Sequence, residues 1–566
     1  MIENYNYINK RSKSINTLRF RVLISLAAIF LVGLVILFTP FILHGVRAVD
    51  YATVSLSESR HLLNSIGEKN WSTAVKSSAL INDNLIKLNL EISRLGPISK
   101  LPKIKNNLKV SQQFIEVAES LVGGYLETFK IFEKVEKSGV LIDPSVLLEN
   151  KEAIKLISQN KDQLSLAQKN IDRAHSSFEA IDTSEFSGPF SKYLIQAHDQ
   201  LGQILESTNI ALPAISLLTD LLGYETQKNY LLVFENNMEL RPTGGFIGSY
   251  GIITVKDGKI KNIFTDDVYN LDKLSEGKMM QPAPLPMMVY NKQQYWYMRD
   301  ANWFASWPDS AKKIVEFFHT ERINANLPNQ QIDGVIAITP DFIANLLEVL
   351  GPIEIQGITF SANNFAMDLE KFVEGGFEEK NIPFEERKSI IGSLSKILIS
   401  RIEKTTTHDF TKLWLAFKKN IDQKNILVYL FDDQLQKYFS DRNWAGEIRA
   451  TDGDYLMVID SNFASLKTDA VMEKSIKRSL SINGSGDLMA RLEITYKHNG
   501  QFVKNLITRY RTYSKVYVPK GSWFESGSIK DGNSETNINM SEGLEYGTEY
   551  EKSFAAYFII IEPGES

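Results

Sequence analysis

The fold is decided around one stretch of sequence, Asn229-Tyr-Leu-Leu-Val-Phe-Glu-Asn-Asn-Met-Glu-Leu-Arg-Pro-Thr-Gly-Gly-Phe-Ile-Gly-Ser-Tyr-Gly251. Its Tyr230–Phe234 run is short, apolar and rich in aromatic and aliphatic residues, which predicts a buried strand. A glycine-rich turn follows directly, at the position where open α/β sheets place their ligand loops. The stretch therefore predicts a sheet and a binding loop beside it.

The predicted turn carries donors that suit an anion. Backbone N–H groups in such a turn can face a single ligand, and an arginine can add a bidentate contact. We therefore predict that a phosphate or carboxylate is bound by Arg241, Thr243, Gly244 and Gly245. The alternative is a tight turn in which Arg241 pairs with Glu235 or Glu239. The glycine spacing matches neither a P-loop nor the dinucleotide fingerprint.

Strands and helices alternate on both sides of this stretch. Further strand-like runs occur at residues 252–255, 335–338, 426–431 and 455–459. Helices are predicted at residues 308–318 and 340–350, because proline and then aspartate occupy the first turn of each. Such alternation is typical of a mainly parallel sheet that helices cover on both faces. We predict an α/β domain over residues 223–462.

Two further segments of this domain carry candidate ligands. Asp266 and Asp267, with Asp272 nearby, could bind a hard divalent cation such as Mg²⁺ through oxygen atoms; the alternative is a solvated loop. Arg299 and Asp300 stand beside aromatic residues and could bind a sugar or a lipid headgroup; the alternative is an aromatic cap over the sheet. The histidines show no metal-binding spacing, and neither a serine-hydrolase nor a zincin motif is present.

An apolar run at residues 22–43 is long enough, at 1.5 Å per residue, to cross a hydrocarbon core of about 30 Å. Basic residues precede it: Lys10, Arg11, Lys13, Arg19 and Arg21. The positive-inside rule then predicts a cytoplasmic tail at residues 1–21, one transmembrane helix, and the rest of the chain outside the cytoplasm. A cleaved signal peptide is the alternative, although its apolar region would normally be shorter.

The remaining segments are predicted from their periodicity. Residues 44–222 repeat apolar positions at steps of three and four, which predicts a helical bundle or stalk. Residues 463–566 show alternating strands separated by Asn-Gly and Asp-Gly turns, which predicts a β-sandwich. Because the chain ends just after an apolar strand, we expect either a truncated sandwich or a last strand paired inside its sheet.

The composition of the 566-residue chain is that of a folded protein, with 43% hydrophobic and 23% charged residues. The net charge of -5 gives no basic surface overall, which makes nucleic acid an unexpected partner. The chain has no cysteine, which excludes disulfides, thiolate metal sites and a cysteine nucleophile.

The stretch from Asn229 to Gly251 resembles the hallmark of a bacterial envelope family known as domain of unknown function 4012 (DUF4012). Arg299-Asp-Ala-Asn302, Asp333-Gly-Val-Ile-Ala-Ile-Thr-Pro340 and Asp460-Ser-Asn462 with Lys467 fit the same family. So does the order of an N-terminal anchor, a helical region, an α/β domain and a C-terminal β-domain. The resemblance implies an envelope location and no settled activity.

A more distant resemblance is to the LytR-CpsA-Psr family, through the order of elements from the first strand to Ile353. Members of that family move glycopolymers from a polyprenyl-pyrophosphate carrier to peptidoglycan, with a magnesium-binding aspartate and several arginines. Here the aspartate position falls near Gly248-Ser249, so the acid is missing. Arg387 matches one family arginine, and Arg241 and Arg299 are candidate substitutes for the others.

Three functions follow from these patterns. The first is binding of an anionic envelope ligand, a polyprenyl phosphate or a cell-wall glycopolymer, by a single-pass membrane protein. The second is magnesium-dependent glycopolymer transfer, and the third is a structural or interaction role in the envelope. Convergence of Arg241, Arg299 and Arg387 on one pocket would favour the first two.

Overall fold

The computed structural model describes residues 42–94, 102–139, 151–185, 192, 195–196, 198–205, 208, 219–224, 226–404, 407–531, 534–538 and 544–565. The chain divides into two compact units that meet in the sequence at residues 226 and 227, with residues 257–259 assigned to the first. No helix in the described ranges combines the length and the apolar character that crossing a bilayer requires. The transmembrane segment predicted at residues 22–43 lies outside those ranges except at its C-terminal end.

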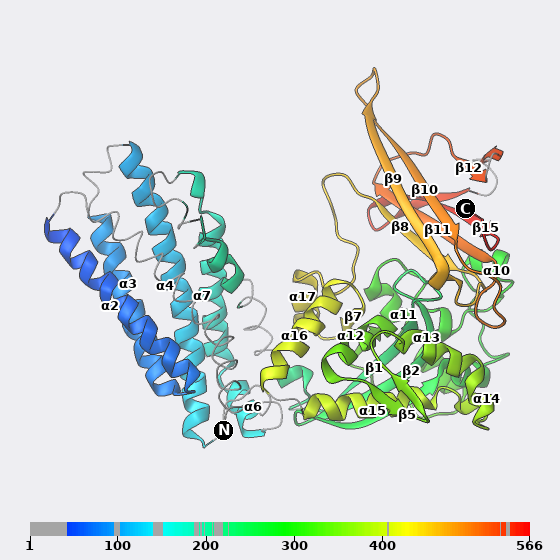
Figure 1. The fold of residues 1–566 in the computed structure, drawn as a ribbon, viewed down its shortest axis with the longest axis horizontal. Helices are drawn as coiled ribbons and strands as arrows, with labels where there is room; N and C mark the ends of the chain where they lie inside the picture. Colours follow the sequence, from blue (N-terminus) through cyan, green and yellow to red (C-terminus); the bar gives the residue numbers. More distant parts are fainter. Residues whose placement is uncertain are drawn as a thin grey trace, which may run out of the picture. The chain divides into compact units, whose positions relative to one another are not determined.

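The first unit is helical. Its helices are α2 (Ile42–Gly67), α3 (Trp71–Ser93), α4 (Pro102–Lys137), α6 (Lys151–Ser158) and α7 (Lys161–Glu179). Figure 1 shows α2, α3, α4 and α7 side by side. On α7 the buried positions Leu164, Ala167, Ile171 and Ala174 recur at steps of three and four, which places them on one face toward α4. Asn70 caps α3 by accepting a hydrogen bond from the N–H of Thr73 at 3.0 Å.

The second unit is built on a five-stranded sheet in the order β3-β2-β1-β4-β7. Its strands are β1 (Lys228–Asn236), β2 (Phe246–Lys256), β3 (Lys259–Asp267), β4 (Gly334–Ile338) and β7 (Ile426–Leu430). β1 pairs parallel with β4 but antiparallel with β2, and β4 pairs antiparallel with β7. The sheet is therefore mixed, and the prediction of a mainly parallel sheet is wrong. The links at residues 237–245 and 257–258 are too short for the crossover that parallel neighbours need.

Helices cover both faces of this sheet. α11 (Trp307–Asn324) packs on one face, where Leu231, Val233 and Val335 meet its buried side chains. A second core joins α12 (Pro340–Leu350), α13 (Phe365–Lys371) and α15 (Ser389–Glu403) to the hairpin of β5 (Ile353–Ile355) and β6 (Ile358–Phe360). Proline lies in the first turn of α11 and α12, as predicted, and Gly351 ends α12 with a φ of 80°.

The remaining helices of the unit are short or lie at its margins. They are α9 (Val268–Leu274), α10 (Leu285–Tyr290), α14 (Phe377–Glu379), α16 (Thr407–Asp422), α17 (Asp433–Asp441) and the short turns η3 (Met298–Asp300), η4 (Phe372–Gly376), η5 (Phe384–Glu386) and η6 (Thr468–Val471). η4 is a π-helix that continues directly from α13. π-Turns of this kind are frequent at functional sites.

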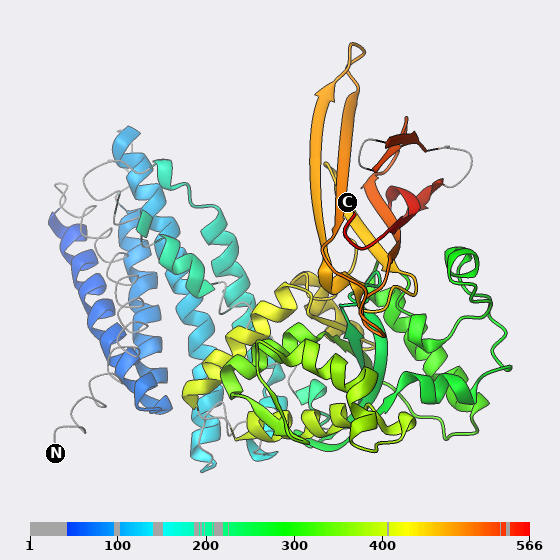
Figure 2. The same ribbon diagram turned by 45° about the vertical axis from the view of Figure 1, so that its right-hand side comes forward.

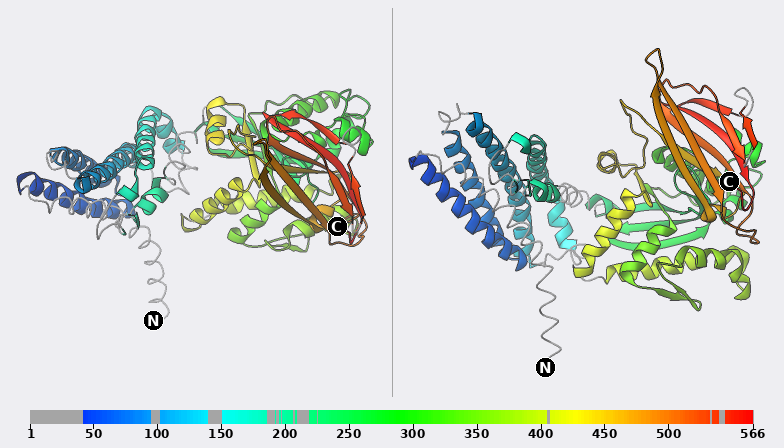
Figure 3. Two further views of the ribbon diagram at one scale, coloured as in Figure 1. Left: turned by 90° about the horizontal axis from the view of Figure 1, so that it is seen from above. Right: turned by 45° about the horizontal axis from the view of Figure 1, so that its top comes forward.

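The C-terminal part forms a four-stranded antiparallel sheet in the order β14-β15-β11-β8. Its strands are β8 (Met457–Asn462), β11 (Tyr510–Pro519), β14 (Leu544–Glu549) and β15 (Lys552–Ile561). Figure 3 shows these strands side by side. The apolar strand β15 is thus an interior strand of its sheet.

One face of this sheet packs on the two-stranded hairpin of residues 472–498, where Tyr496 shares a small core with Tyr510 and Ile561. On the other face, Tyr513, Tyr517 and Phe554 share one core with Trp307 of α11 and with Leu231 of β1. A long hairpin of β9 (Met472–Ile482) and β10 (Leu488–His498) projects from the unit, as Figure 2 shows, and a small hairpin joins β12 (Ser528–Asp531) to β13 (Ser534–Asn537). The alternation of apolar residues predicted strands correctly but could not identify what each face packs against.

Candidate functional site

A cavity of about 750 Å³ lies where β1 and β4 end. Phe234, Glu235 and Asn236 line it from the end of β1, and Ile338 and Thr339 from the end of β4 and the residue after it. These are the carboxyl ends of two parallel strands, where open α/β sheets bind ligands. The volume falls in the range of about 300–1,000 Å³ that is usual for small-molecule sites.

One part of the cavity wall is apolar. It comes from α12, α13, η4 and α15, through Ile343, Phe365, Leu369, Val373, Ile391, Leu394 and Leu398. The same side chains pack into the core that holds these helices together. This part of the wall is therefore fixed by close packing and suits a hydrocarbon chain.

Another part of the wall is polar, and one of its residues, Ser249, adjoins a β-bulge. Phe234 pairs with Ser249, but Glu235 pairs with Ile247, so Gly248 is an extra residue in β2. Register partners of an antiparallel pair have their side chains on the same face of the sheet, so Ser249 shares a face with Phe234. Ser249 is buried and lines the cavity, and its Oγ has no hydrogen-bond partner within the described part of the chain.

Two cations beside Ser249 share one carboxylate. Arg387 Nη2 lies 3.2 Å from Asp267 Oδ2, and Lys388 Nζ lies 3.0 Å from Asp267 Oδ1. Lys388 Nζ also donates to the carbonyl oxygen of Gly248. The guanidinium of Arg387 stacks over Phe384, and its buried Nε has no hydrogen-bond partner among the residues described. At this corner of the cavity two cationic side chains pair with one carboxylate, and one buried donor is unused.

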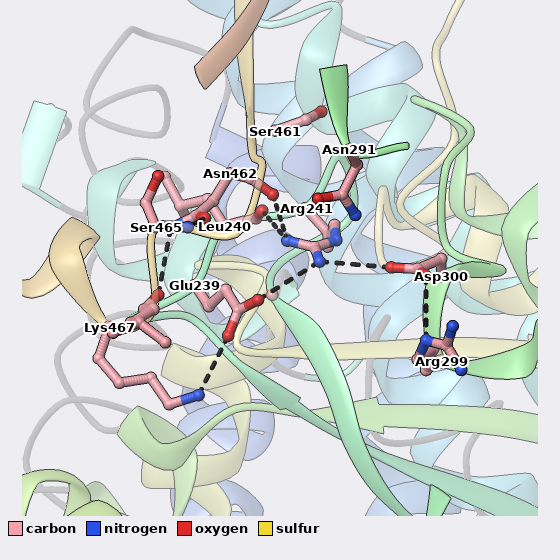
Figure 4. Close-up of polar contacts among 12 residues, drawn as sticks. Glu239, Leu240, Arg241, Asn291, Arg299, Asp300, Ser461, Asn462, Ser465 and Lys467 are labelled. Carbon is pink, nitrogen blue, oxygen red and sulfur yellow. Dashed lines mark hydrogen bonds and ion pairs between the residues drawn. The ribbon is translucent and has the colours of Figure 1, made fainter. Parts of the chain in front are cut away.

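A chain of alternating charges borders the rest of the polar wall (Figure 4). Figure 4 shows it from Lys467 through Glu239, Arg241 and Asp300 to Arg299, and it continues from Arg299 to Asp272. Successive ion pairs measure 3.0, 3.4, 3.3, 3.5 and 2.7 Å. Of these six residues, Lys467, Glu239, Arg299 and Asp272 line the cavity. Because positive and negative side chains alternate, this network of ion pairs is nearly neutral overall. Buried charges are tolerated when they are paired in this way.

Arg241 lies within this network of ion pairs and does not line the cavity. Its Nη1 donates to the carbonyl oxygens of Leu240 at 3.0 Å and Asn462 at 2.8 Å, and its Nη2 to Glu239 and Asp300. Figure 4 shows the guanidinium between these acceptors. The arrangement is the alternative considered from the sequence, a turn in which Arg241 pairs with Glu239. Its role is to tie the β1–β2 turn to the end of β8.

The glycines of the turn serve close packing of the chain on itself. A Cβ on Gly245 would lie 2.2 Å from the backbone of Asn236, and a Cβ on Gly244, where φ is 144°, would lie 2.3 Å from Oε2 of Glu235. Thr243 Oγ1 lies 3.5 Å from Oε1 of Glu235. Neither glycine lines the cavity, and nor does Thr243.

Burial shifts the protonation of several carboxyls. It raises the pKa of Glu235 to about 8, although Asn302 donates to Oε1 at 2.9 Å. It also raises the pKa of Asp272 to about 6 and that of Glu321 to about 10. Asp272 and Glu321 interact directly, and Asp272 Oδ1 and Glu321 Oε2 have no other hydrogen-bond partner in the described ranges. The pair therefore holds a proton at neutral pH.

The predicted magnesium ligands have other partners. Asp267 is paired with Arg387 and Lys388, and Asp266 Oδ1 accepts hydrogen bonds from the Asp267 N–H at 2.8 Å and from Asn270 at 2.7 Å. The two cationic side chains already paired with Asp267 would repel a metal ion at the same carboxylate. Among the residues described, no group of three or more acidic or histidine side chains is arranged to hold a metal ion.

The three arginines that the sequence singled out do not all converge. Arg299 and Arg387 line the same cavity, whereas Arg241 and Asp300 lie behind its wall. Sequence reasoning missed Lys388, and it noted Ser249 only as the place where the LytR-CpsA-Psr resemblance puts an aspartate. Gly248, the extra residue near the start of β2, was a further signal for this position.

The fold is thus an α/β protein with an amphipathic cavity at the carboxyl ends of its parallel strands. Residues 225–372 match the model of the family described as "Protein of unknown function (DUF4012)", which confirms the DUF4012 resemblance for that stretch. The resemblance to the LytR-CpsA-Psr family stays a suspicion. No curated protein and no solved structure matches the chain.

Proposed function

We propose that this protein binds an amphipathic anionic ligand of the polyprenyl-phosphate or lipid-linked glycopolymer kind. The anionic head would lie at Ser249, Arg387 and Lys388, and the hydrocarbon chain along Leu369, Leu394 and Leu398. The observation that carries the proposal is the pair of buried, unpartnered donors, Ser249 Oγ and Arg387 Nε, on two residues that line a cavity with an apolar wall. Buried donors without partners are costly, and a phosphate would supply acceptors for both.

The test is a calorimetric titration of the full chain with farnesyl phosphate and, as the uncharged comparison, farnesol. Farnesyl phosphate should bind more tightly than farnesol. Arg387→Gln should weaken phosphate binding about ten- to a hundredfold, and Ser249→Ala by about two- to tenfold, because each removes a contact made to the charged head. Leu394→Trp should reduce binding of both ligands by filling the apolar part of the cavity.

The matched control is Ser393→Ala, an exposed serine of α15 that does not line the cavity. It should leave both affinities unchanged. Equal binding of farnesyl phosphate and farnesol would contradict the proposal. So would an Arg387→Gln variant that binds farnesyl phosphate as tightly as the wild type and whose melting curve shows that it is folded.

Glycopolymer transfer with magnesium is the second candidate, and no observation in the cavity favours it. Asp267 already has two cationic partners. If farnesyl phosphate binds only when Mg²⁺ is present, the transferase gains support. A purely structural role predicts no binding at all.

A further inference from the structure

At one end of the polar wall, the acidic side chains outnumber the cationic side chains that pair with them. Around Lys467, the Nζ lies 3.0 Å from Glu239, 3.7 Å from Glu370 and 3.6 Å from Glu374. Glu239 is also paired with Arg241. In the described part of the chain, Glu370 and Glu374 have ion pairs only with Lys467.

The two glutamates sit at the junction of α13 and the π-helix η4, and both line the cavity. Their side chains are 12% and 28% exposed. Burial raises the pKa of Glu370, and Glu374 adds to that effect while Lys467 opposes it. Two buried carboxylates that share one ammonium group are only partly compensated. A further cation that reaches them would stabilise their ionised form.

The other corner of the same polar wall has the opposite excess. Arg387 and Lys388 share the single carboxylate of Asp267. Ser249 and Arg387, whose buried Oγ and Nε have no hydrogen-bond partner among the described residues, line the cavity at this corner. The two corners are within electrostatic reach of each other, because the charge of Lys388 acts on Glu370 and that of Lys467 acts on Lys388.

From this separation of charge we infer that the head of the ligand is zwitterionic: its anionic group binds at Ser249 and Arg387, and an ammonium group binds between Glu370 and Glu374. The inference rests on the proposed lipid-binding function. A purely anionic head would bind at Ser249 and Arg387 but would leave the acidic corner uncompensated. A phosphate ester that carries a primary amine satisfies both corners.

The test is a competition between two lysolipids of equal acyl chain, lysophosphatidylethanolamine, which carries an amine, and lysophosphatidylglycerol, which does not. Native mass spectrometry of the full chain with equimolar lipids measures the ratio of the two complexes, which does not depend on the folded fraction. The wild type should prefer the amine-bearing lipid by about tenfold or more, as for one charge-assisted hydrogen bond. In Glu370→Gln/Glu374→Gln the ratio should fall to about one.

Glu378→Gln/Glu379→Gln is the matched control, since it removes the same charge from exposed positions of α14. It should keep the wild-type ratio. Glu374→Gln alone changes the more exposed of the two positions and should lower the ratio partly. This single variant provides the test if the double variant does not fold.

Three results would overturn the inference alone: equal binding of the two lysolipids by the wild type, an unchanged ratio in both Glu374 variants, or binding of farnesyl phosphate without either lysolipid. Failure of all three lipids to bind would overturn the proposed function as well.

Discussion

At the scale of single residues, Arg241 is a structural cation. Its guanidinium donates to two carbonyl oxygens and two carboxylates that come from the β1–β2 turn, η3 and β8. The side chain is 5% exposed. A buried charge with this many partners stabilises the fold through its network, and removing it leaves the partners uncompensated.

We therefore expect Arg241→Ala to lower the free energy of unfolding by about 3–5 kcal/mol. Arg241→Lys should recover little of it, because one ammonium cannot reach acceptors arranged around a planar fork. Chemical denaturation measures the change. Arg509→Ala, at an exposed pair with Glu562, is the control and should cost no more than about 1 kcal/mol. A stable Arg241→Ala variant with weakened ligand binding would restore Arg241 as a ligand contact.

Glu235 makes stability depend on pH. The folded carboxyl keeps its proton up to a pKa of about 8, whereas the unfolded one loses it near 4.5. The folded state thus binds more protons between these values, so this contribution to stability is complete below about pH 4.5 and is lost as the pH rises to about 8.

Glu235→Gln should remove that dependence, because the amide oxygen still accepts from Asn302 and nothing ionises. Relative to wild type, the variant should gain about 2–4 kcal/mol of unfolding free energy between pH 5 and pH 9. Denaturation at both pH values measures the difference. A constant difference across that range would show that Glu235 is ionised throughout.

At the scale of elements, the β1–β2 connection positions the site. Ser249 borders the cavity next to the bulge at Gly248, and the turn before the bulge packs against the end of β1 without space for another side chain. Gly245 shows this most directly, since a Cβ there would meet backbone atoms of Asn236 and Asn237, which cannot move like the end of a flexible side chain.

Gly245→Ala should therefore lower stability by about 1–3 kcal/mol or more, the usual cost of overpacking. Gly484→Ala, in the turn between β9 and β10, meets nothing within 4 Å and should change stability by no more than about 0.5 kcal/mol. Thermal melts of the two variants give the comparison. Equal melting temperatures would mean that the turn can relax around the added methyl group.

At the scale of the whole molecule, the α/β part and the C-terminal sheet of the second unit share one core. Trp307 and Leu231 from the former pack in the same cluster as Phe463, Tyr513 and Phe554 from the latter. Neither part buries its apolar face without the other, so the two should unfold together.

A chain that ends at residue 456 should consequently fail to fold, even though it retains the whole five-stranded sheet. Size-exclusion chromatography and circular dichroism should find it aggregated, whereas the full chain shows one transition for this unit. A monodisperse truncated chain with cooperative unfolding would contradict the shared core.

The location of the bulk of the chain outside the cytoplasm is a prediction from the basic residues near its N-terminus. Basic residues gather before residue 22, and the positive-inside rule then puts the bulk of the chain outside the cytoplasm. A reporter that is active only outside the cytoplasm, fused after residue 222, should be active. Activity of a cytoplasmic reporter at the same position would contradict the assignment.

Sequence alone identified the DUF4012 stretch, the strand Tyr230–Phe234, the proline-started helices α11 and α12, and Arg299 and Arg387 as residues of interest, because periodicity, capping and local motifs are properties of neighbouring residues. Only the tertiary structure decided that the sheet is mixed, that Arg241 is internal, and that Ser249, Lys467 and Glu370 border one cavity. The last two outcomes depend on contacts between segments more than a hundred residues apart, such as Arg241 with Asn462. The energy of such contacts depends on burial and on the partners that folding supplies, and neither is encoded in the local spacing of residues.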